Sequence, residues 1–362
     1  MKFLSSFKKL DWILIISPFF LFGLGLLSIY SSSLGRGDFL NFKKQIIFFV
    51  IGVLLMFFLS FFDWRIFREN TYLMLVLYCF CLITLIGLFF FAPEIRGVRG
   101  WYKLGPVSFD PVELTKIILM LVLAKYFSTR HIEMYQIRHI LISGFYVLIP
   151  SVLIFLQPNL GSTLILIALW VGILIISGIK LRHFLILILC GLLVLIFSWG
   201  FLLKDYQKAR VMSFLSPSDP LGMSWNQNQA KIAIGSGGIF GQGIGNGSQT
   251  RYGFLPEPQT DFIFAALAEE TGLAGIGFLF LLFSVLLWRI IKIALLSQSN
   301  FGRLFATGFS ILLISQIFIH IGMNLGILPI IGISLPLVSY GGSGLIATFA
   351  ALGILQNMRN QP

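Results

Sequence analysis

Charge is the scarcest property of this 362-residue chain. Only 11% of its residues are charged and 14 are acidic, whereas 57% are hydrophobic and the mean hydropathy is +0.93. A soluble domain carries about 25% charged residues, so this composition excludes an ordinary soluble protein. Apolar runs of about 20 residues, the length that crosses a hydrocarbon core, recur along the chain. They indicate helical spans and not a β-barrel, whose strands would be about 10 residues long with alternating polarity.

Cysteine is also nearly absent. Cys79, Cys81 and Cys190 all lie inside apolar runs, where a small buried side chain explains them better than a disulfide or a metal ligand. The first apolar run follows a basic start, is long enough to span and has no obvious cleavage site, which indicates a retained span and not a signal peptide. The net charge of +12 is spread over short clusters between the runs. Membrane topology and lipid headgroups explain such clusters better than a nucleic-acid partner does.

The apolar runs and polar breaks predict ten helical spans in one membrane domain covering residues 1–362. The spans lie near 11–31, 45–62, 71–92, 111–128, 140–157, 160–178, 183–203, 261–288, 303–325 and 335–356. With the N-terminus inside, 14 Lys and Arg residues lie on the inner side and 6 lie in the short outer loops. The positive-inside rule therefore favours cytoplasmic N- and C-termini. Residues 204–260 then form a large extracytoplasmic loop between spans 7 and 8.

Three outer stretches, 93–111, 204–260 and 324–344, are rich in glycine and proline yet partly apolar. Irregular backbone near a membrane is tolerated only when it is buried in protein or lines a cavity. We therefore expect these stretches to fold over one another and shape a cavity. Seven glycines fall within 235–247. They either form a flexible loop or let the backbone approach a ligand closely.

The large loop also carries basic and polar residues. Its cations are Lys204, Lys208, Arg210, Lys231 and Arg251, and Trp225 and the run 227–229, which includes Gln229, lie between them. Contact with lipid headgroups explains the cations, and so does a pocket for a phosphorylated substrate. The amides and the indole suit sugar hydroxyls and sugar ring faces. Spacing alone leaves these alternatives open.

Two acidic positions lie at or inside spans. Glu113 and Lys116 are three residues apart and share a helix face, either as a structural ion pair or as part of a polar site. Asp261 stands where the polar loop meets an apolar run. It can cap the helix together with Thr260, or it can serve as a functional anion at the wall of the outer cavity. The helix dipole lowers the pKa of such a carboxyl and desolvation raises it, so the sequence leaves both roles open.

Several long motifs resemble those of the SEDS family (shape, elongation, division and sporulation), the RodA/FtsW polytopic cell-wall polymerases. They are RGVRGWYKLGPVSFDPVELTK (96–116), QPNLGS (157–162), AIGSGGIFGQG (233–243), FLPEPQTDFIFAALAEETG (254–272) and NLGILPIIGISLPLVSYGGSG (324–344). The resemblance covers essentially the whole chain, and the last motif is closer to RodA than to FtsW. Three stretches depart from the family pattern: Asp110-Pro111-Val112-Glu113 replaces Gln-Pro-Ser-Glu, Asn159 replaces a common aspartate, and Gly100, next to Arg99, replaces a frequent arginine before the tryptophan.

The resemblance implies a fold of ten spans and a peptidoglycan glycosyltransferase that polymerises lipid II during cell elongation. The family's catalytic aspartate corresponds to Asp261, its Trp…Glu-x-x-Lys stretch to Trp101, Glu113 and Lys116, and its loop arginine to Arg210. In the expected reaction Asp261 takes a proton from an acceptor sugar hydroxyl. Cationic residues, for which Arg210, Lys231 and Arg251 are the candidates, offset the charge that develops on pyrophosphate.

The same resemblance implies an inner-membrane enzyme whose site faces outward. Its partners would be lipid II, the nascent glycan strand, a class B penicillin-binding protein and other elongation proteins. A divalent cation, Mg or Mn, could assist the pyrophosphate, although the sequence contains no dedicated ligand cluster. The alternatives are a division-specific FtsW-like polymerase, a lipid II flippase, or a scaffold for other cell-wall enzymes.

Overall fold

The computed structural model describes residues 10–94, 99–105, 107–130, 137–203, 205–215 and 223–360. Its long helices are α2 (Trp12–Arg36), α3 (Leu40–Phe61), α5 (Thr71–Phe91), α6 (Pro111–Arg130), α7 (Ile137–Leu156), α8 (Leu160–Ile176), α9 (Leu181–Phe197, continued by the π-helix η2, Ser198–Leu202), α13 (Ile263–Leu296), α14 (Asn300–Leu325) and α15 (Gly342–Asn360). Each overlaps one predicted span. Seven are long and apolar enough to cross a membrane; α8 is shorter, at 17 residues, and α6 carries Glu113, Lys116 and Lys125.

Shorter elements connect these helices. They are α4 (Arg65–Glu69), β1 (Tyr102–Leu104), β2 (Val107–Phe109), α10 (Asp205–Leu215), α11 (Met223–Ser236) and α12 (Ser248–Arg251). The strands form an antiparallel hairpin that the sequence did not indicate, with Tyr102 opposite Phe109 and Gly105 at φ 62° in the turn. The Tyr102 hydroxyl donates to the Thr84 carbonyl of α5 at 2.7 Å. The hairpin is therefore anchored on the bundle beside the start of α6.

Helix ends follow local sequence signals. Asp11, Asn70, Asn159 and Ser299 are N-cap residues whose side chains accept a backbone N–H of the first helical turn of α2, α5, α8 and α14. Such caps satisfy donors that would otherwise lack a partner in an apolar surrounding. Gly326 ends α14 in the left-handed conformation, at φ 77°.

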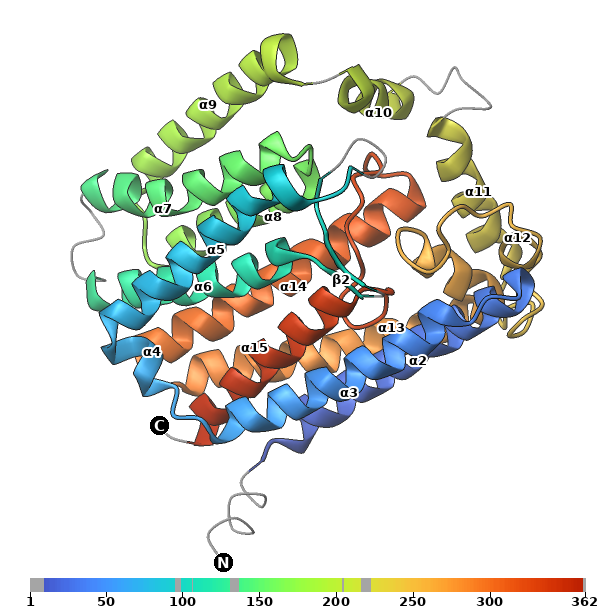
Figure 1. Ribbon diagram of the computed structural model, residues 1–362, viewed down its shortest axis with the longest axis horizontal. Coiled ribbons are helices and arrows are strands. Elements are labelled where there is room, and N and C mark those ends of the chain that lie inside the picture. The colour runs from blue at the N-terminus through green and yellow to red at the C-terminus, as the bar shows by residue number, and fades with distance from the viewer. Residues whose placement is uncertain are drawn as a thin grey trace, which may run out of the picture.

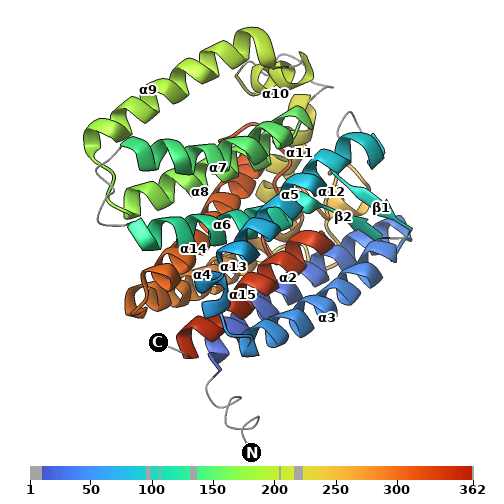
Figure 2. The same cartoon turned by 60° about the vertical axis from the view of Figure 1, so that its left-hand side comes forward.

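The last long helix, α15, packs beside α3. Figure 1 and Figure 2 show α15 running beside α3, with α13 and α2 behind them and with the start of α2 and the end of α15 at the same end of the bundle. At that end the buried Asp11 carboxylate pairs with Arg289 of α13 and, at 3.2 Å, with Arg359 of α15. By contrast, α9 has no buried residue and runs apart from the other long helices in both views.

The glycine-rich run packs against α13. An added Cβ at Gly237 would lie 2.0 Å from the Ala268 carbonyl oxygen, and one at Gly241 would lie 2.1 Å from that of Glu270. Only glycine permits backbones to approach this closely. Two residues after Glu270, α13 has a non-helical residue at Gly272, with φ 65° and ψ −164°. The glycines therefore join the loop to a kinked helix, and the flexible-loop interpretation does not describe them.

Two buried carboxylates complete this junction. Glu269 accepts hydrogen bonds from the backbone N–H groups of Gln249 and Thr250, at 2.7 and 3.0 Å, at the start of α12. Glu270 accepts from the Ser31 hydroxyl of α2. Both carboxylates fix the large loop on the bundle.

We expect Asp11→Asn to lower the stability of the folded protein by about 2–4 kcal/mol, because two cations lose a buried partner. Asparagine keeps an oxygen that can cap α2, so the variant isolates the charge. Thermal unfolding in detergent measures the loss. Asp38→Asn is the matched control, since Asp38 also accepts a backbone N–H (Leu40, 2.8 Å) but is exposed; its cost should stay below about 1 kcal/mol. Equal melting shifts for the two variants would contradict the role of the ion pairs.

Candidate functional site

Asp261 lies between the large loop and α13, and its backbone is held by a neighbouring helix. Phe262 is the N-cap residue of α13 and makes no side-chain cap bond. The buried Asn324 side chain of α14 supplies that bond instead: its oxygen accepts the Ala265 N–H at 3.2 Å, and its nitrogen donates to the Asp261 carbonyl at 3.0 Å. Asp261 and Thr260 are therefore not the caps of α13.

The two residues before Asp261 are held in the same way. The Ser339 hydroxyl donates to the Thr260 carbonyl at 3.0 Å, and the Tyr340 N–H donates to the Gln259 carbonyl at 2.8 Å. The buried Gln259 side chain donates to Ser33 of α2 at 3.2 Å and accepts from Asn41 of α3 at 2.7 Å. Three consecutive carbonyls are thus bonded by groups outside the loop. This clamp fixes the backbone from which the Asp261 side chain projects.

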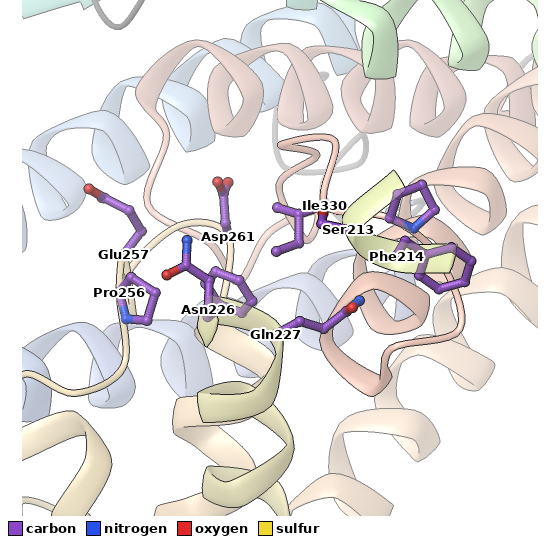
Figure 3. A pocket seen from close by; sticks show the side chains of 10 residues that line it. Ser213, Phe214, Asn226, Gln227, Pro256, Glu257, Asp261 and Ile330 are labelled. Atoms are coloured by element: carbon purple, nitrogen blue, oxygen red, sulfur yellow. The ribbon is translucent and has the colours of Figure 1, made fainter. Parts of the chain in front are cut away.

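Asp261 lines two cavities. One, of about 410 Å³, lies among α3, the β-hairpin, α6, α8 and the segment before α15; its lining includes Lys44, Trp101, Asp110, Glu113, Lys116, Asn159, Tyr340 and Ser343. The other, of about 330 Å³, is lined by Ser213, Phe214, Asn226, Gln227, Pro256, Glu257, Phe262, Pro329 and Ile330 in addition to Asp261. Figure 3 shows Asp261 and Glu257 beside Asn226 at this second cavity. The three outer stretches therefore do shape a cavity, as their composition predicts.

An ion pair forms one wall of the larger cavity. Lys116 Nζ lies 2.6 Å from Glu113 Oε1, and the Lys116 side chain is 2% exposed whereas that of Glu113 is 18% exposed. The pair lies within α6, where it stabilises the helix, and it also lines the larger cavity. Asp110 precedes it, and its Oδ1 accepts the Val112 N–H at 2.9 Å. Burial, with Glu113 adding repulsion, raises the pKa of Asp110 from 3.8 to about 7.

The predicted site residues separate into two groups. Trp101, Glu113 and Lys116 line the larger cavity together with Asp261. Trp225, Gln229, Lys231 and Arg251 are not among the described residues that line either cavity. Lys231 and Arg251 are exposed, and Lys231 lies against Gly326 at the C-terminal end of α14, where a cation suits the helix dipole. Arg210 belongs to α10, but its side chain lies outside the described part of the chain, as does Lys204.

Other lining residues were missed as candidates in the sequence. Lys44 brings a second cation to the larger cavity, from the N-terminal end of α3. The sequence shows it only as part of the pair Lys43-Lys44 at the end of a span, a basic cluster of the kind that membrane topology and lipid headgroups explain. Asn226 lines the smaller cavity from α11. Its neighbour Gln227 anchors the helix there by donating to the Met323 and Leu328 carbonyls, at 3.1 and 2.9 Å.

In the described part of the chain, no three His, Cys, Asp or Glu residues are grouped so that they could hold a metal ion.

The comparisons with known proteins agree with this architecture. The pattern of the FtsW/RodA/SpoVE family, described as cell cycle protein, matches residues 11–362. Peptidoglycan glycosyltransferase MrdB of Escherichia coli is 40% identical over 283 residues, which are 78% of this chain and 76% of MrdB. Stage V sporulation protein E of Bacillus subtilis is 36% identical over 357 residues, which cover 96% of each chain.

Solved structures match as well. A chain of a peptidoglycan synthase complex that coordinates polymerization and crosslinking gives a TM-score of 0.81 at 32% identity, with 97% of each chain covered. The rod shape determining protein RodA of Thermus thermophilus gives 0.72 at 30% identity, with 97% of this chain and 96% of RodA covered. The protein belongs to the FtsW/RodA/SpoVE family of multi-pass membrane proteins.

The raised pKa of Asp110 predicts a pH dependence of stability. Between about pH 4 and pH 7 the folded protein keeps a proton on Asp110 that the unfolded chain has lost, so Asp110 makes stability fall as pH rises through this window. Asp110→Asn keeps an oxygen for the Val112 N–H and removes this contribution. Melting temperatures measured in detergent from pH 4 to pH 8 should therefore fall less steeply for the variant than for the wild type. Parallel curves would show that Asp110 titrates normally.

Proposed function

We propose that this protein is a peptidoglycan glycosyltransferase that polymerises lipid II into glycan strands during cell elongation. The observation that carries the proposal is the position of Asp261, a carboxylate shared by two cavities of about 410 and 330 Å³. A transferase has to hold two substrates against one proton acceptor. The names of the relatives support the reaction: MrdB of Escherichia coli and FtsW of Haemophilus influenzae are named as peptidoglycan glycosyltransferases, the latter as a probable one, at 40% and 34% identity.

In the proposed reaction, Asp261 acts as general base. It removes the proton from the 4-hydroxyl of the acceptor's terminal N-acetylglucosamine, and the oxygen attacks C1 of the donor sugar. The bond from C1 to pyrophosphate breaks, and the electron pair leaves on the phosphate oxygen. Because pyrophosphate is a good leaving group, one carboxylate and a cationic surrounding suffice, in contrast to the paired carboxylates of glycosidases.

The residues that line the two cavities support assigning each cavity to a different substrate. Lys44 and Lys116 provide cations beside Asp261 in the larger cavity, although Glu113 neutralises Lys116. Lys44 is therefore our candidate for offsetting the developing phosphate charge, in place of Lys231 and Arg251. The smaller cavity contains Asn226 and Gln227, whose amides suit sugar hydroxyls. We assign donor pyrophosphate to the larger cavity and acceptor sugar to the smaller one.

The setting of this reaction is part of the proposal. Ten spans with cytoplasmic termini put Asp261 at the outer face of the bacterial inner membrane, where lipid II is consumed. A crosslinking partner, a class B penicillin-binding protein, is supported by the resemblance to a chain of a synthase complex that couples polymerization to crosslinking. The likeness to the rod shape determining protein of Thermus thermophilus supports elongation over division.

Asp261→Asn should abolish polymerisation. Asparagine keeps the size of the side chain but cannot accept the hydroxyl proton, and loss of a general base typically costs about 10²–10⁴-fold in rate. The assay is glycan polymer formed from labelled lipid II by the purified protein with its partner. Glu257→Gln is the competing variant, because Glu257 is the other carboxylate in the smaller cavity. Polymerisation that survives Asp261→Asn but not Glu257→Gln would move the base to Glu257. A wild type that only translocates lipid II would favour a flippase.

Asn324→Ala should also reduce turnover, by about 10–100-fold, because a side chain displaced by about 1 Å loses the productive geometry. The matched control is Asn357→Ala. Asn357 is also a buried amide with backbone partners, accepting the Trp64 N–H at 3.3 Å and donating to the Ser60 carbonyl at 2.7 Å, but it lies at the opposite end of the bundle. Rates are compared per folded protein. Equal losses in both variants would reduce the Asn324 clamp to a stability effect.

A further inference from the structure

A third cavity lies at the end of the bundle where α2 begins and α15 ends. It has a volume of about 290 Å³ and is formed by α5, α6 and α7; its lining residues are Thr71, Met74, Leu75, Tyr78, Val122, Lys125, Tyr126, Thr129 and Tyr146. Glu113 of the larger outer cavity and Lys125 of this one both belong to α6. They are 12 positions apart on α6, which corresponds to about 18 Å along the axis. The two cavities are therefore separate.

Lys125 is the unusual member of this cavity. Its Nζ is buried and has no hydrogen-bond partner within the described part of the chain, and none of the lining residues is acidic. A buried ammonium group without a partner is unfavourable, and charges inside membrane proteins are normally paired. The nearby hydroxyl groups of Tyr78 and Tyr126 are engaged with the Tyr146 carbonyl at 2.9 Å and His139 Nδ1 at 3.0 Å, and a neutral hydroxyl would in any case supply no counter-charge. Within the described part of the chain no lining residue balances the charge of Lys125, so an external anion can fill that role.

A helix end points to the same kind of ligand. Thr71 is the first residue of α5, a helix of 21 residues whose Leu73 N–H is capped by Asn70, so the positive end of the dipole of α5 lies at this cavity. Helix N-termini favour phosphate and carboxylate groups. The buried cation and the helix start are independent features, and both favour an anion. A phosphate group satisfies each of them.

The rest of the cavity suits an amphiphile. Met74, Leu75 and Val122 give it an apolar wall. Leu75 continues an apolar face of α5 that is open to the membrane, where Tyr72, Leu75 and Val76 are 83%, 58% and 62% exposed. A free phosphate ion would leave this wall uncovered, whereas an acyl chain would cover it. We propose that the cavity binds the phosphate headgroup of an anionic membrane lipid, with Lys125 as its counter-ion and the acyl chain along α5.

The test is lipid binding by the purified full chain, followed by native mass spectrometry in detergent. The probes are phosphatidylglycerol, diacylglycerol, which lacks the phosphate, and inorganic phosphate alone. Wild type should retain phosphatidylglycerol and release diacylglycerol. Lys125→Gln should bind phosphatidylglycerol about tenfold more weakly, the size expected for one charged hydrogen bond.

Two further variants make the result specific. Lys292→Gln is the matched control, because Lys292 is an exposed cation of α13, on the same turn as Arg289 at that end of the bundle, and it should bind as the wild type does. Val122→Phe keeps Lys125 but fills the cavity, so it should weaken lipid binding even if Lys125→Gln folds poorly. Equal weakening by Lys125→Gln and Lys292→Gln would reveal only general attraction to anionic lipid and overturn the site. Phosphate alone binding as tightly as the lipid, and depending on Lys125, would overturn the lipid as occupant.

Discussion

The structure depends on one constraint: a peptide group at the membrane surface needs a partner within the protein when water cannot reach it. The segment that ends in Asp261 is irregular, and although the Glu257 carbonyl accepts the N–H groups of Thr260 and Phe262, the carbonyls that follow depend on groups elsewhere. Groups from α14 and from the segment after it bond the carbonyls of residues 259, 260 and 261. Asp261 is therefore positioned by main-chain hydrogen bonds, and its side chain is left to face both cavities.

The same requirement for a partner within the protein explains where charges lie. Most ionisable groups inside the bundle are matched: Asp11 with two arginines, Glu113 with Lys116, and Glu269 with the N–H groups of α12. Matched charges hold helices together. The groups to which we assign functional roles stand at cavities, Asp261 and Lys44 at the larger one and Lys125 at the other end of the bundle. Burial alone therefore does not single out a candidate functional charge in this protein, and a position beside a cavity is a further criterion.

The sequence could predict the helices well because each span requires a long apolar run. It could also single out the position of Asp261, because this carboxylate stands where the polar loop meets such a run. It could place Glu113 and Lys116 on one face from their spacing. It could not assign Lys231 or Arg251, because a basic residue in a loop has the same signature whether it faces a substrate, a helix end or solvent. The packing of the glycine run could not be predicted for a related reason: its close partner, the backbone of 268–270, lies more than 20 residues away in the sequence. Contacts of this kind depend on tertiary packing, which local pattern does not encode.

The pairing of Asp11 with Arg289 and Arg359 has a consequence for biosynthesis. The chain emerges from the ribosome with α2 long before α15, so the Asp11 carboxylate waits without Arg359 until α15 has been synthesised. Likewise, α3 waits for α15, its neighbour in the bundle. Individual helices can insert one by one, but the bundle closes only after α15 has been made. A chain truncated before α15 would insert its earlier spans and still lack the neighbour on which α3 and the Asp11 junction rely.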